Sequence, residues 1–246
     1  MKKYVCVLST NDYLDGCLVL NENLKHVHSE YSLLCLINEE IDKETRKTLD
    51  KFGIEYKVLE KVNYDVDYND FIQPYFKNTF DKLSVFNLTE YEKIVYLDLD
   101  LLILENIDEL FDYDGLSMAK DYPFTEYYNS GVMVIEPRKY DYDGLIKIMK
   151  EKMENKEHIS DQNIINEFFK DNINILPQVY NLLRRIYGDQ ERQVYAVWNW
   201  DDDIEGKKIL HYIISPKPFQ IDAPYEEKYS YLYSYYMAII NEKKNV

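Results

Sequence analysis

The stretch 93-KIVYLDLDLLILENIDELF-111 places two carboxylates, Asp98 and Asp100, in a run of isoleucine, valine, tyrosine and leucine. The segment 94–97 predicts a strand that is apolar on both faces, and such strands lie in the middle of a parallel sheet. An unpaired charge buried inside that sheet would be costly. The two aspartates are therefore expected at the carboxyl end of the strand, where open α/β sheets bind their ligands.

Strands and helices alternate on both sides of this stretch. Strands are predicted at 3–8, 31–37, 54–60, 94–97, 116–119, from Gly131 onward and at 207–213. Helices are predicted after the polar turn 9–12 to about 28, then at 41–52, about 74–88, 142–152, 161–169 and about 225–241. This order predicts one α/β domain, 1–246, with a mostly parallel, Rossmann-like central sheet flanked by helices.

The balance of charge limits the partners. The 246 residues contain 45 acids and 29 bases and carry a net charge of −16. An acidic surface repels phosphate backbones, so nucleic acid is not expected as a partner. A phosphate-containing small ligand would need local screening by a few lysines or by a bound cation.

The cysteines and the hydropathy indicate a protein of the cytosol. Cys6, Cys17 and Cys35 lie in apolar surroundings with no metal-ligand spacing, which is typical of small core residues in a reducing compartment. The apolar segment at the N-terminus is too short for a signal peptide. No stretch is long enough to span a membrane.

The spacing of Asp98 and Asp100 suggests a metal site. Side chains at i and i+2 of an extended segment point the same way, and two converging carboxylates repel unless one is protonated or a cation lies between them. Mn²⁺ and Mg²⁺ prefer oxygen ligands and bridge to phosphates. Acid-x-acid triplets arise repeatedly in so acidic a chain, so it is the apolar context that favours a metal here.

Six blocks in order resemble a known family: STNDYLDG, DKL, YLDLDLLILENIDELFD, YNSGVMVIEP, SDQNIINEFF and HYIISPKPF. Together they look like a retaining glycosyltransferase of the glycogenin type, family 8, over about 5–219. The resemblance implies a GT-A fold and a hexosyltransferase that uses a UDP-sugar, with glucose favoured, and Mn²⁺ or Mg²⁺. It also implies a nucleotide-binding part at about 1–120 and an acceptor-side part, with the last helix, at about 121–246.

The resemblance also implies roles for individual residues. The metal ligands would be Asp98, Asp100 and His211. The donor would be bound by Leu8, Thr10, Asn11, Tyr13, Asp98, Leu99, Asp121, Asn129, Ser130 and Lys217, and the catalytic residues would be Asp161, Lys82 and Gln162. Lys82 and Lys217 would contact the donor's phosphates. Asp161 would be a transient nucleophile or a stabiliser of the cationic sugar; both roles stay open, and the residue could also simply favour the first turn of its helix.

The acceptor is less well specified. Glycogenin-like proteins can add glucose to one of their own tyrosines, and Tyr195 precedes His211 at nearly the family acceptor's distance. The family also resembles bacterial sugar-adding enzymes, so a glycan or protein hydroxyl is expected, with self-modification as one option. Apolar residues at helical spacing in the last helix favour docking on the core over a dimer surface, which leaves a homodimer open.

Two other functions compete with this one. Haloacid-dehalogenase-type phosphatases also place Asp-x-Asp after an apolar strand, but they need a hydroxyl where this chain has Leu102. A nucleotide-sugar-binding or scaffold protein without activity is the non-enzymatic alternative. It is suggested by Ile214, which replaces the family's usual glycine, and by a first turn that is one residue short.

Overall fold

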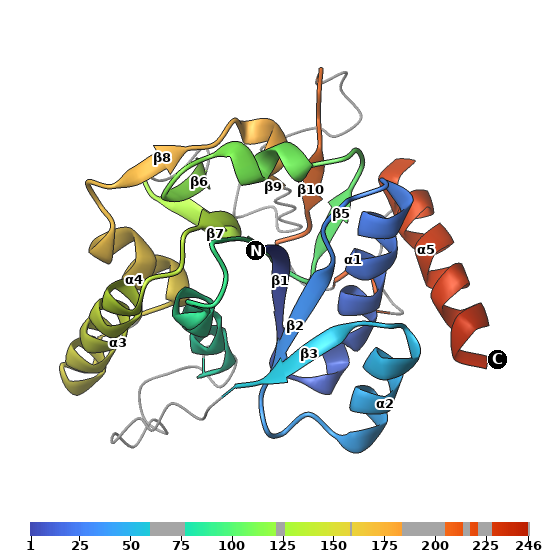
Figure 1. The fold of residues 1–246 in the computed structure, drawn as a ribbon, viewed down its shortest axis with the longest axis horizontal. Helices are drawn as coiled ribbons and strands as arrows, with labels where there is room; N and C mark the ends of the chain where they lie inside the picture. The colour runs from blue at the N-terminus through green and yellow to red at the C-terminus, as the bar shows by residue number, and fades with distance from the viewer. Residues whose placement is uncertain are drawn as a thin grey trace, which may run out of the picture.

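A computed structural model describes residues 1–59, 77–121, 126–157, 159–183, 205–213, 217–220 and 228–245. Its main sheet has seven strands in the order β3-β2-β1-β4-β7-β6-β8 (Figure 1). These strands are β1 Lys2–Leu8, β2 Leu33–Ile37, β3 Glu55–Val58, β4 Lys93–Leu97, β6 Leu116–Lys120, β7 Tyr128–Ile135 and β8 Ile173–Ile175. The predicted central strand, β4, is the fourth of the seven, and all five of its residues are buried.

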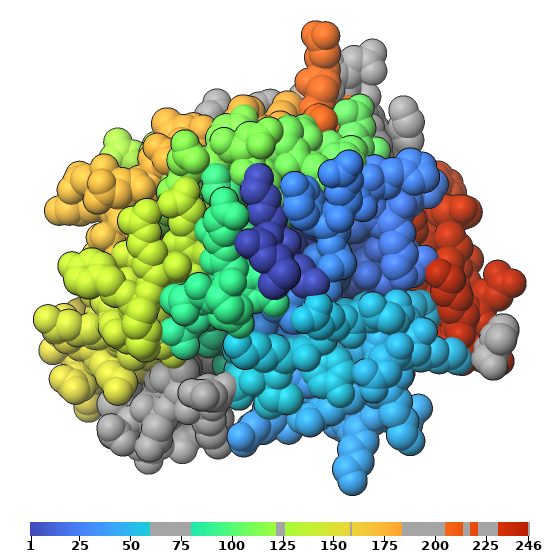
Figure 2. All heavy atoms as spheres, viewed as in Figure 1, coloured from blue at the N-terminus to red at the C-terminus, as the bar shows by residue number. Residues whose placement is uncertain are grey.

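Two apolar layers cover the sheet because successive strand residues point to opposite faces. On β1, Tyr4, Cys6 and Leu8 pack toward one core with the helices α1 (Leu14–His26), α2 (Lys43–Lys51) and α5 (Lys228–Asn245). Val5 and Val7 pack toward the other core, with α3 (Lys139–Glu154), α4 (Asp161–Phe168) and the 3-10 helix η2 (Lys77–Asn87). Figure 2 shows α5 at the outer edge of the N-terminal elements, with α3 and α4 on the opposite side of the molecule.

The sheet is mixed rather than wholly parallel. Strands β3, β2, β1 and β4 run parallel to one another, whereas β7 is antiparallel to both β4 and β6. Only seven residues, 121–127, join β6 to β7, and a parallel connection needs a crossover of about a dozen residues or more. The expected alternation of strand and helix therefore stops at β6.

A second sheet follows directly from the quoted stretch. Residues Asp98–Asp100 join β4 to β5 (Leu101–Ile103), which pairs antiparallel with β10 (Ile209–His211), and β10 pairs with β9 (Leu182–Leu183). The apolar run after Asp100 is thus a second strand that was not predicted. The chain leaves the large sheet and enters the small one at the two aspartates.

The α-helices lie where helices were predicted, but one predicted helix is a 3-10 helix and three short 3-10 helices were not predicted. The segment predicted as a helix at about 74–88 is a 3-10 helix over Lys77–Asn87, with Phe80, Leu83 and Phe86 buried. Short 3-10 helices also occur at Asn11–Tyr13 (η1), Asp108–Asp112 (η3) and Gln178–Tyr180 (η4). None of the described helices is long and apolar enough to cross a membrane.

Candidate active site

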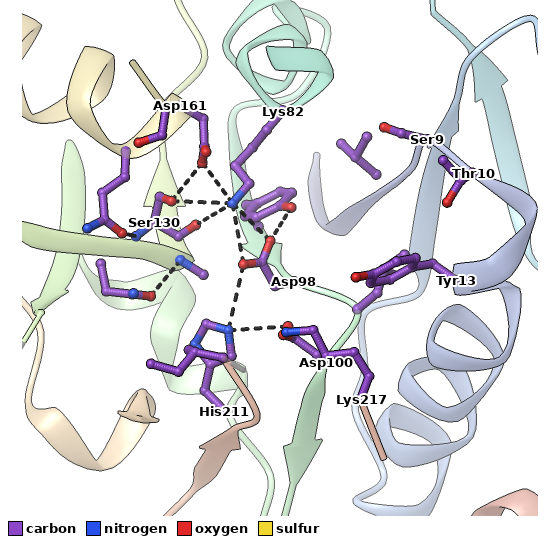
Figure 3. Close-up of a pocket in the computed structure, with 18 residues that line it drawn as sticks. Ser9, Thr10, Tyr13, Lys82, Asp98, Asp100, Ser130, Asp161, His211 and Lys217 are labelled. Atoms are coloured by element: carbon purple, nitrogen blue, oxygen red, sulfur yellow. Dashed lines mark hydrogen bonds and ion pairs between the residues drawn. The ribbon is translucent and has the colours of Figure 1, made fainter. Parts of the chain in front are cut away.

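A cavity of about 650 Å³ opens where β1 and β4 end and the small sheet begins. Figure 3 shows side chains from several parts of the chain turned toward it. They come from the turn after β1, from η2, from the β4–β5 link, from the starts of β7 and α4, and from the segment after β10. Of the predicted residues, those that line it are Thr10, Tyr13, Lys82, Asp98, Leu99, Asp100, Asn129, Ser130, Asp161, Gln162, His211 and Lys217.

The three predicted metal ligands converge within this cavity. Each of Asp98, Asp100 and His211 offers one ligand atom, and these atoms lie within 4.8 Å of one another. Nε2 of His211 is 3.2 Å from a carboxylate oxygen of Asp100 and 3.7 Å from one of Asp98. The pairing of His211 with Leu101 across β10 and β5 brings the histidine beside the aspartates although more than a hundred residues separate them.

Buried amides fix the histidine ring. The side-chain NH₂ of Asn181 donates to Oδ1 of Asn129 at 2.9 Å, so Oδ1 of Asn181 is left to accept from Nδ1 of His211, also at 2.9 Å. This arrangement places the ring proton on Nδ1 and turns the lone pair of Nε2 toward the aspartates. A Cβ on Gly131 would lie 2.2 Å from Cε1 of His211, so the ring needs a glycine at this position.

Lys217 is ion-paired with the second aspartate. Its Nζ lies 2.6 Å from Oδ2 of Asp100 and donates to the carbonyl of Tyr212 at 2.8 Å. Burial raises the pKa of the Asp100 carboxyl, but the charge of Lys217 and the close approach of the His211 ring outweigh burial and hold that pKa below its ordinary value. The carboxylate is therefore ionised and ready to bind a cation.

Lys82 connects the first aspartate to the opposite wall. Its Nζ is 3.0 Å from Oδ1 of Asp98 and 2.9 Å from Oδ2 of Asp161. Burial lowers the pKa of Lys82, but the charges of Asp161 and Asp98 more than offset this and raise it above its usual value. The hydroxyl of Tyr96 donates to Oδ1 of Asp98 at 2.5 Å, which holds that carboxylate at the end of β4.

The start of α4 carries the candidate catalytic residue. Ser160 caps the helix through a reciprocal pair of bonds with Asn163, and the 6% exposed Asp161 stands in the first turn. The hydroxyl of Ser130 donates to Oδ2 of Asp161 at 2.8 Å. The structural and functional interpretations of Asp161 are thus compatible: it begins a capped helix and faces the cavity.

Hydrogen bonds connect three further predicted site residues, Asp121, Gln162 and Ser130. The amide of Gln162 donates to Oδ2 of Asp121 at 2.9 Å and accepts from the backbone N–H of Ser130 at 3.3 Å. Asp121 is buried and stands behind Gln162, outside the cavity lining.

The predicted donor-binding residues at the end of β1 and in the turn after it lie in two different environments. Thr10 and Tyr13 line the cavity, and the Tyr13 ring packs edge-on against Phe219 with 5.3 Å between centroids. Leu8 is fully buried in the core, whereas Asn11 is exposed and accepts from the backbone N–H of Asp42 at 3.3 Å. The structure thus does not turn Leu8 and Asn11 toward the cavity.

The residues of the site that sequence reasoning missed include Ser9, Tyr96, Gly131 and Asn181. Ser9, Tyr96 and Gly131 lie next to or within the quoted blocks, where only the neighbouring side chains received roles. Asn181 is fully buried before β9, outside every block, and a buried asparagine is informative only once its partners are known. Ile214 and Tyr195 lie outside the described residues.

The donor atoms fit a divalent cation. Two carboxylates and one imidazole nitrogen form the mixed oxygen and nitrogen set that suits Mn²⁺ and also accepts Mg²⁺. The imidazole is already oriented by its second nitrogen, as is usual for metal-binding histidines.

Comparisons with known proteins agree with the geometry. The sequence pattern described as "Glycosyl transferase family 8" matches residues 4–222. Glycogenin-1 of Caenorhabditis elegans is 32% identical over 220 residues, covering 86% of this chain and 49% of the glycogenin. Galactinol synthase 1 of Ajuga reptans is 27% identical over 248 residues, covering 86% of this chain and 71% of the synthase. The chain therefore spans about half the length of that glycogenin.

The fold also matches a solved structure. The glycosyltransferase GlyE of Streptococcus pneumoniae TIGR4 superimposes with a TM-score of 0.70 and 22% identity, covering 98% of this chain and 63% of GlyE. At that identity the likeness supports the GT-A fold, in agreement with the predicted fold class.

Proposed function

The chain belongs to glycosyl transferase family 8, and from this premise we propose that it transfers a hexose, glucose being favoured, from a UDP-sugar to a glycan or protein hydroxyl. The transfer proceeds with retention of configuration and requires Mn²⁺ or Mg²⁺. Membership of this family sets the phosphatase alternative aside.

One observation supports the proposal most: the arrangement of charges in the cavity. The carboxylates of Asp98, Asp100 and Asp161 surround the ammonium groups of Lys82 and Lys217. Three negative charges against two positive ones leave the cluster with a single negative charge, which attracts a dication and repels a free diphosphate. A cation held by Asp98, Asp100 and His211 would reverse that balance, and a bound Mn²⁺ or Mg²⁺ would supply Lewis-acid stabilisation of the leaving diphosphate.

The protein's own residues would divide the remaining work. Lys82 and Lys217 lie beside the predicted metal ligands and can turn their ammonium groups to the diphosphate as its charge develops. Asp161 lies on the far side of Lys82, where the sugar of a donor anchored at the aspartates would extend. There its carboxylate would stabilise the oxocarbenium-like sugar or attack it. Gln162 and Ser130 would hold the sugar hydroxyls.

The acceptor is proposed only as a hydroxyl compound. The relatives are named for different products, glycogenin and galactinol synthase, so the family alone does not fix it. Self-modification at Tyr195 is one form of the proposal. The intact mass after incubation with the donor tests it directly.

Release of UDP from a panel of UDP-sugars, with and without Mn²⁺, tests the function. We expect turnover with Mn²⁺ in the wild type and its loss in Asp100→Asn. Asp108→Asn is the matched control, because Asp108 is also anchored by several hydrogen bonds but lies away from the cavity.

Each outcome is decisive for one part of the proposal. Equal turnover by wild type and Asp100→Asn would contradict the metal assignment. Binding of a UDP-sugar, seen as a raised melting temperature, without release of UDP in any acceptor mixture would favour the binding-protein alternative.

A further inference from the structure

The three cysteines, which their spacing in sequence did not connect, meet in one cluster. Cys6 of β1 and Cys35 of β2 are direct partners in the parallel register, so their side chains stand together on the face that α1 covers. Cys17 comes down from α1 onto that pair. The three sulfur atoms lie within 4.8 Å of one another, and all three cysteines are fully buried and form no disulfide.

The sulfur spacing suits coordination rather than a disulfide. The sulfurs of Cys6 and Cys17 are 3.8 Å apart, far beyond the S–S bond length of about 2.05 Å. Three thiolates bound at about 2.3 Å to one centre, with bond angles at or somewhat below the tetrahedral value, stand about 3.4–3.8 Å from each other. Hydrogen bonds from the thiols of Cys35 and Cys6 also lower the pKa of Cys17, so the three sulfurs already interact.

Charge decides which ligand the cluster can take. The sulfurs lie in the apolar core that α1 and the sheet enclose, where an uncompensated charge is expensive. A dication bound by three thiolates would leave one negative charge there, together with an open fourth position. A trivalent centre bound by three thiolates is neutral and complete with three ligands.

We propose that Cys6, Cys17 and Cys35 form a binding site for a trivalent thiophilic metalloid, of which arsenite is the accessible probe. The reaction is an exchange without oxidation or reduction. Each As–OH bond of arsenous acid is replaced by an As–S bond, and each thiol proton leaves with the displaced hydroxide as water. Three thiols thus release three waters, and no charge is created in the core.

Occupation of this site would restrain the nucleotide-binding part of the chain. The cluster ties β1, β2 and α1 together just below the turn that bears Thr10 and Tyr13. Gly16, the residue before Cys17, packs against Leu99 of the cavity wall. A Cβ on Gly16 would lie only 2.4 Å from the carbonyl oxygen of Leu99. Because the thiols are buried, entry requires a local opening of α1, and binding is expected to be slow.

Incubation of the folded, reductant-free protein with sodium arsenite tests the proposal. The chain has only three cysteines, so no other thiol competes. We expect the mass to rise by one arsenic less three hydrogens, and the melting temperature to rise, because the ligand binds the folded form. Cys17→Ala retains two thiols and should bind arsenite at least about tenfold more weakly. Val19→Ala, which removes a buried side chain from the same helix but keeps every thiol, should bind like the wild type.

Three results would contradict the proposed arsenite-binding site. Arsenic bound with a lowered melting temperature would mean that only unfolded chains react. Equal affinity in Cys17→Ala would exclude the three-sulfur geometry. Equal or tighter binding of Cd²⁺ would contradict the trivalent class.

Discussion

The ammonium nitrogen of Lys217 lies 2.6 Å from Oδ2 of Asp100, one of the three predicted metal ligands, and both side chains are buried. The lysine therefore neutralises the carboxylate while no other cation is bound. A cation shared with His211 would approach Oδ1 of Asp100, which lies 3.2 Å from Nε2 of the histidine, whereas the lysine holds Oδ2. Repulsion by that cation would displace the ammonium from Oδ2, and the ammonium could then meet the diphosphate. Metal and nucleotide are expected to favour each other's binding.

Lys217→Met should consequently separate two affinities. Without the competing ammonium, the nucleotide-free protein should bind Mn²⁺ about tenfold more tightly, equivalent to about 1.4 kcal/mol. The affinity for UDP should fall, because one phosphate contact is lost. Electron paramagnetic resonance of free Mn²⁺ measures the first affinity, and calorimetry with UDP the second. Lys93→Met, which removes another buried ion-paired lysine away from the cavity, should leave both unchanged. A weaker Mn²⁺ affinity in Lys217→Met would contradict the displacement.

Six of the seven strands of the large sheet were predicted, because they carry short, dense apolar runs between helices. The exception is β8, Ile173–Ile175, none of whose residues is buried. The apolar run that surrounds Asp98 and Asp100 led directly to β4 and to the cavity at its end. The small sheet was not predictable in the same way. Strand β9 contains only Leu182 and Leu183, and its partners come from distant parts of the chain. No local period marks so short a strand.

The residues of the candidate site likewise divide into those that the sequence predicted and those that it did not. Residues within the quoted blocks were located from the resemblance, and most of them line the cavity. Three predicted residues do not line it. Leu8 points into the core, Asn11 lies beside Asp42 at the start of α2, and Asp121 is buried behind Gln162. The cysteine cluster was missed because parallel register, not spacing along the chain, aligns Cys6 with Cys35.

Asn181 should matter for the metal although it is not a ligand. It holds Nδ1 of His211 at 2.9 Å, and such partners typically change metal affinity by about 10- to 100-fold when they are removed. Asn181→Leu is therefore expected to weaken Mn²⁺ binding within that range. Asn21→Leu is the control, because Asn21 is a buried asparagine of α1 whose side chain donates to the carbonyl oxygen of Phe52, away from the cavity. Its variant reports any effect that lost stability alone has on Mn²⁺ affinity. An equal loss of Mn²⁺ affinity in both variants would refute the orienting role.

Asp108 should make stability depend on pH. Burial raises the pKa of this carboxyl, but hydrogen bonds from the N–H of Glu30 and from Ser29 and Tyr4 outweigh burial and lower it. A folded-state pKa below the unfolded value, which is about 3.9, adds stability above that pH and loses it as the pH falls toward the folded-state pKa.

Asp108→Asn is therefore expected to reduce the free energy of unfolding by about 1–2 kcal/mol at pH 7. The difference from the wild type should shrink as the pH drops below about 4. Urea unfolding of both proteins from pH 7 down to about pH 3.5, which is just below the carboxyl pKa of the unfolded chain, measures this difference in the free energy of unfolding. Asp114→Asn, at a carboxylate whose side chain is 89% exposed, should show little difference at either end. A constant difference for Asp108→Asn across this range would exclude linkage to its pKa.

Asp161 provides the sharpest separation of binding from chemistry. Its carboxylate touches Lys82 and Ser130 rather than the three predicted metal ligands, so Asp161→Asn should keep the affinities for Mn²⁺ and UDP within about threefold. Sugar transfer should fall by about 10²-fold or more, because the lost charge acts on the cationic sugar. Asp141→Asn is the matched control, since Asp141 also stands in the first turn of a helix.

Two measurements complete this comparison. Single-turnover rates at saturating donor report the chemical step, and calorimetry reports binding. If Asp161 acts only through the helix dipole, both aspartate variants should lose a similar, small amount of stability and neither should lose transfer. A variant with unchanged transfer would remove Asp161 from the mechanism and leave the cation and lysines as the groups that drive departure of UDP.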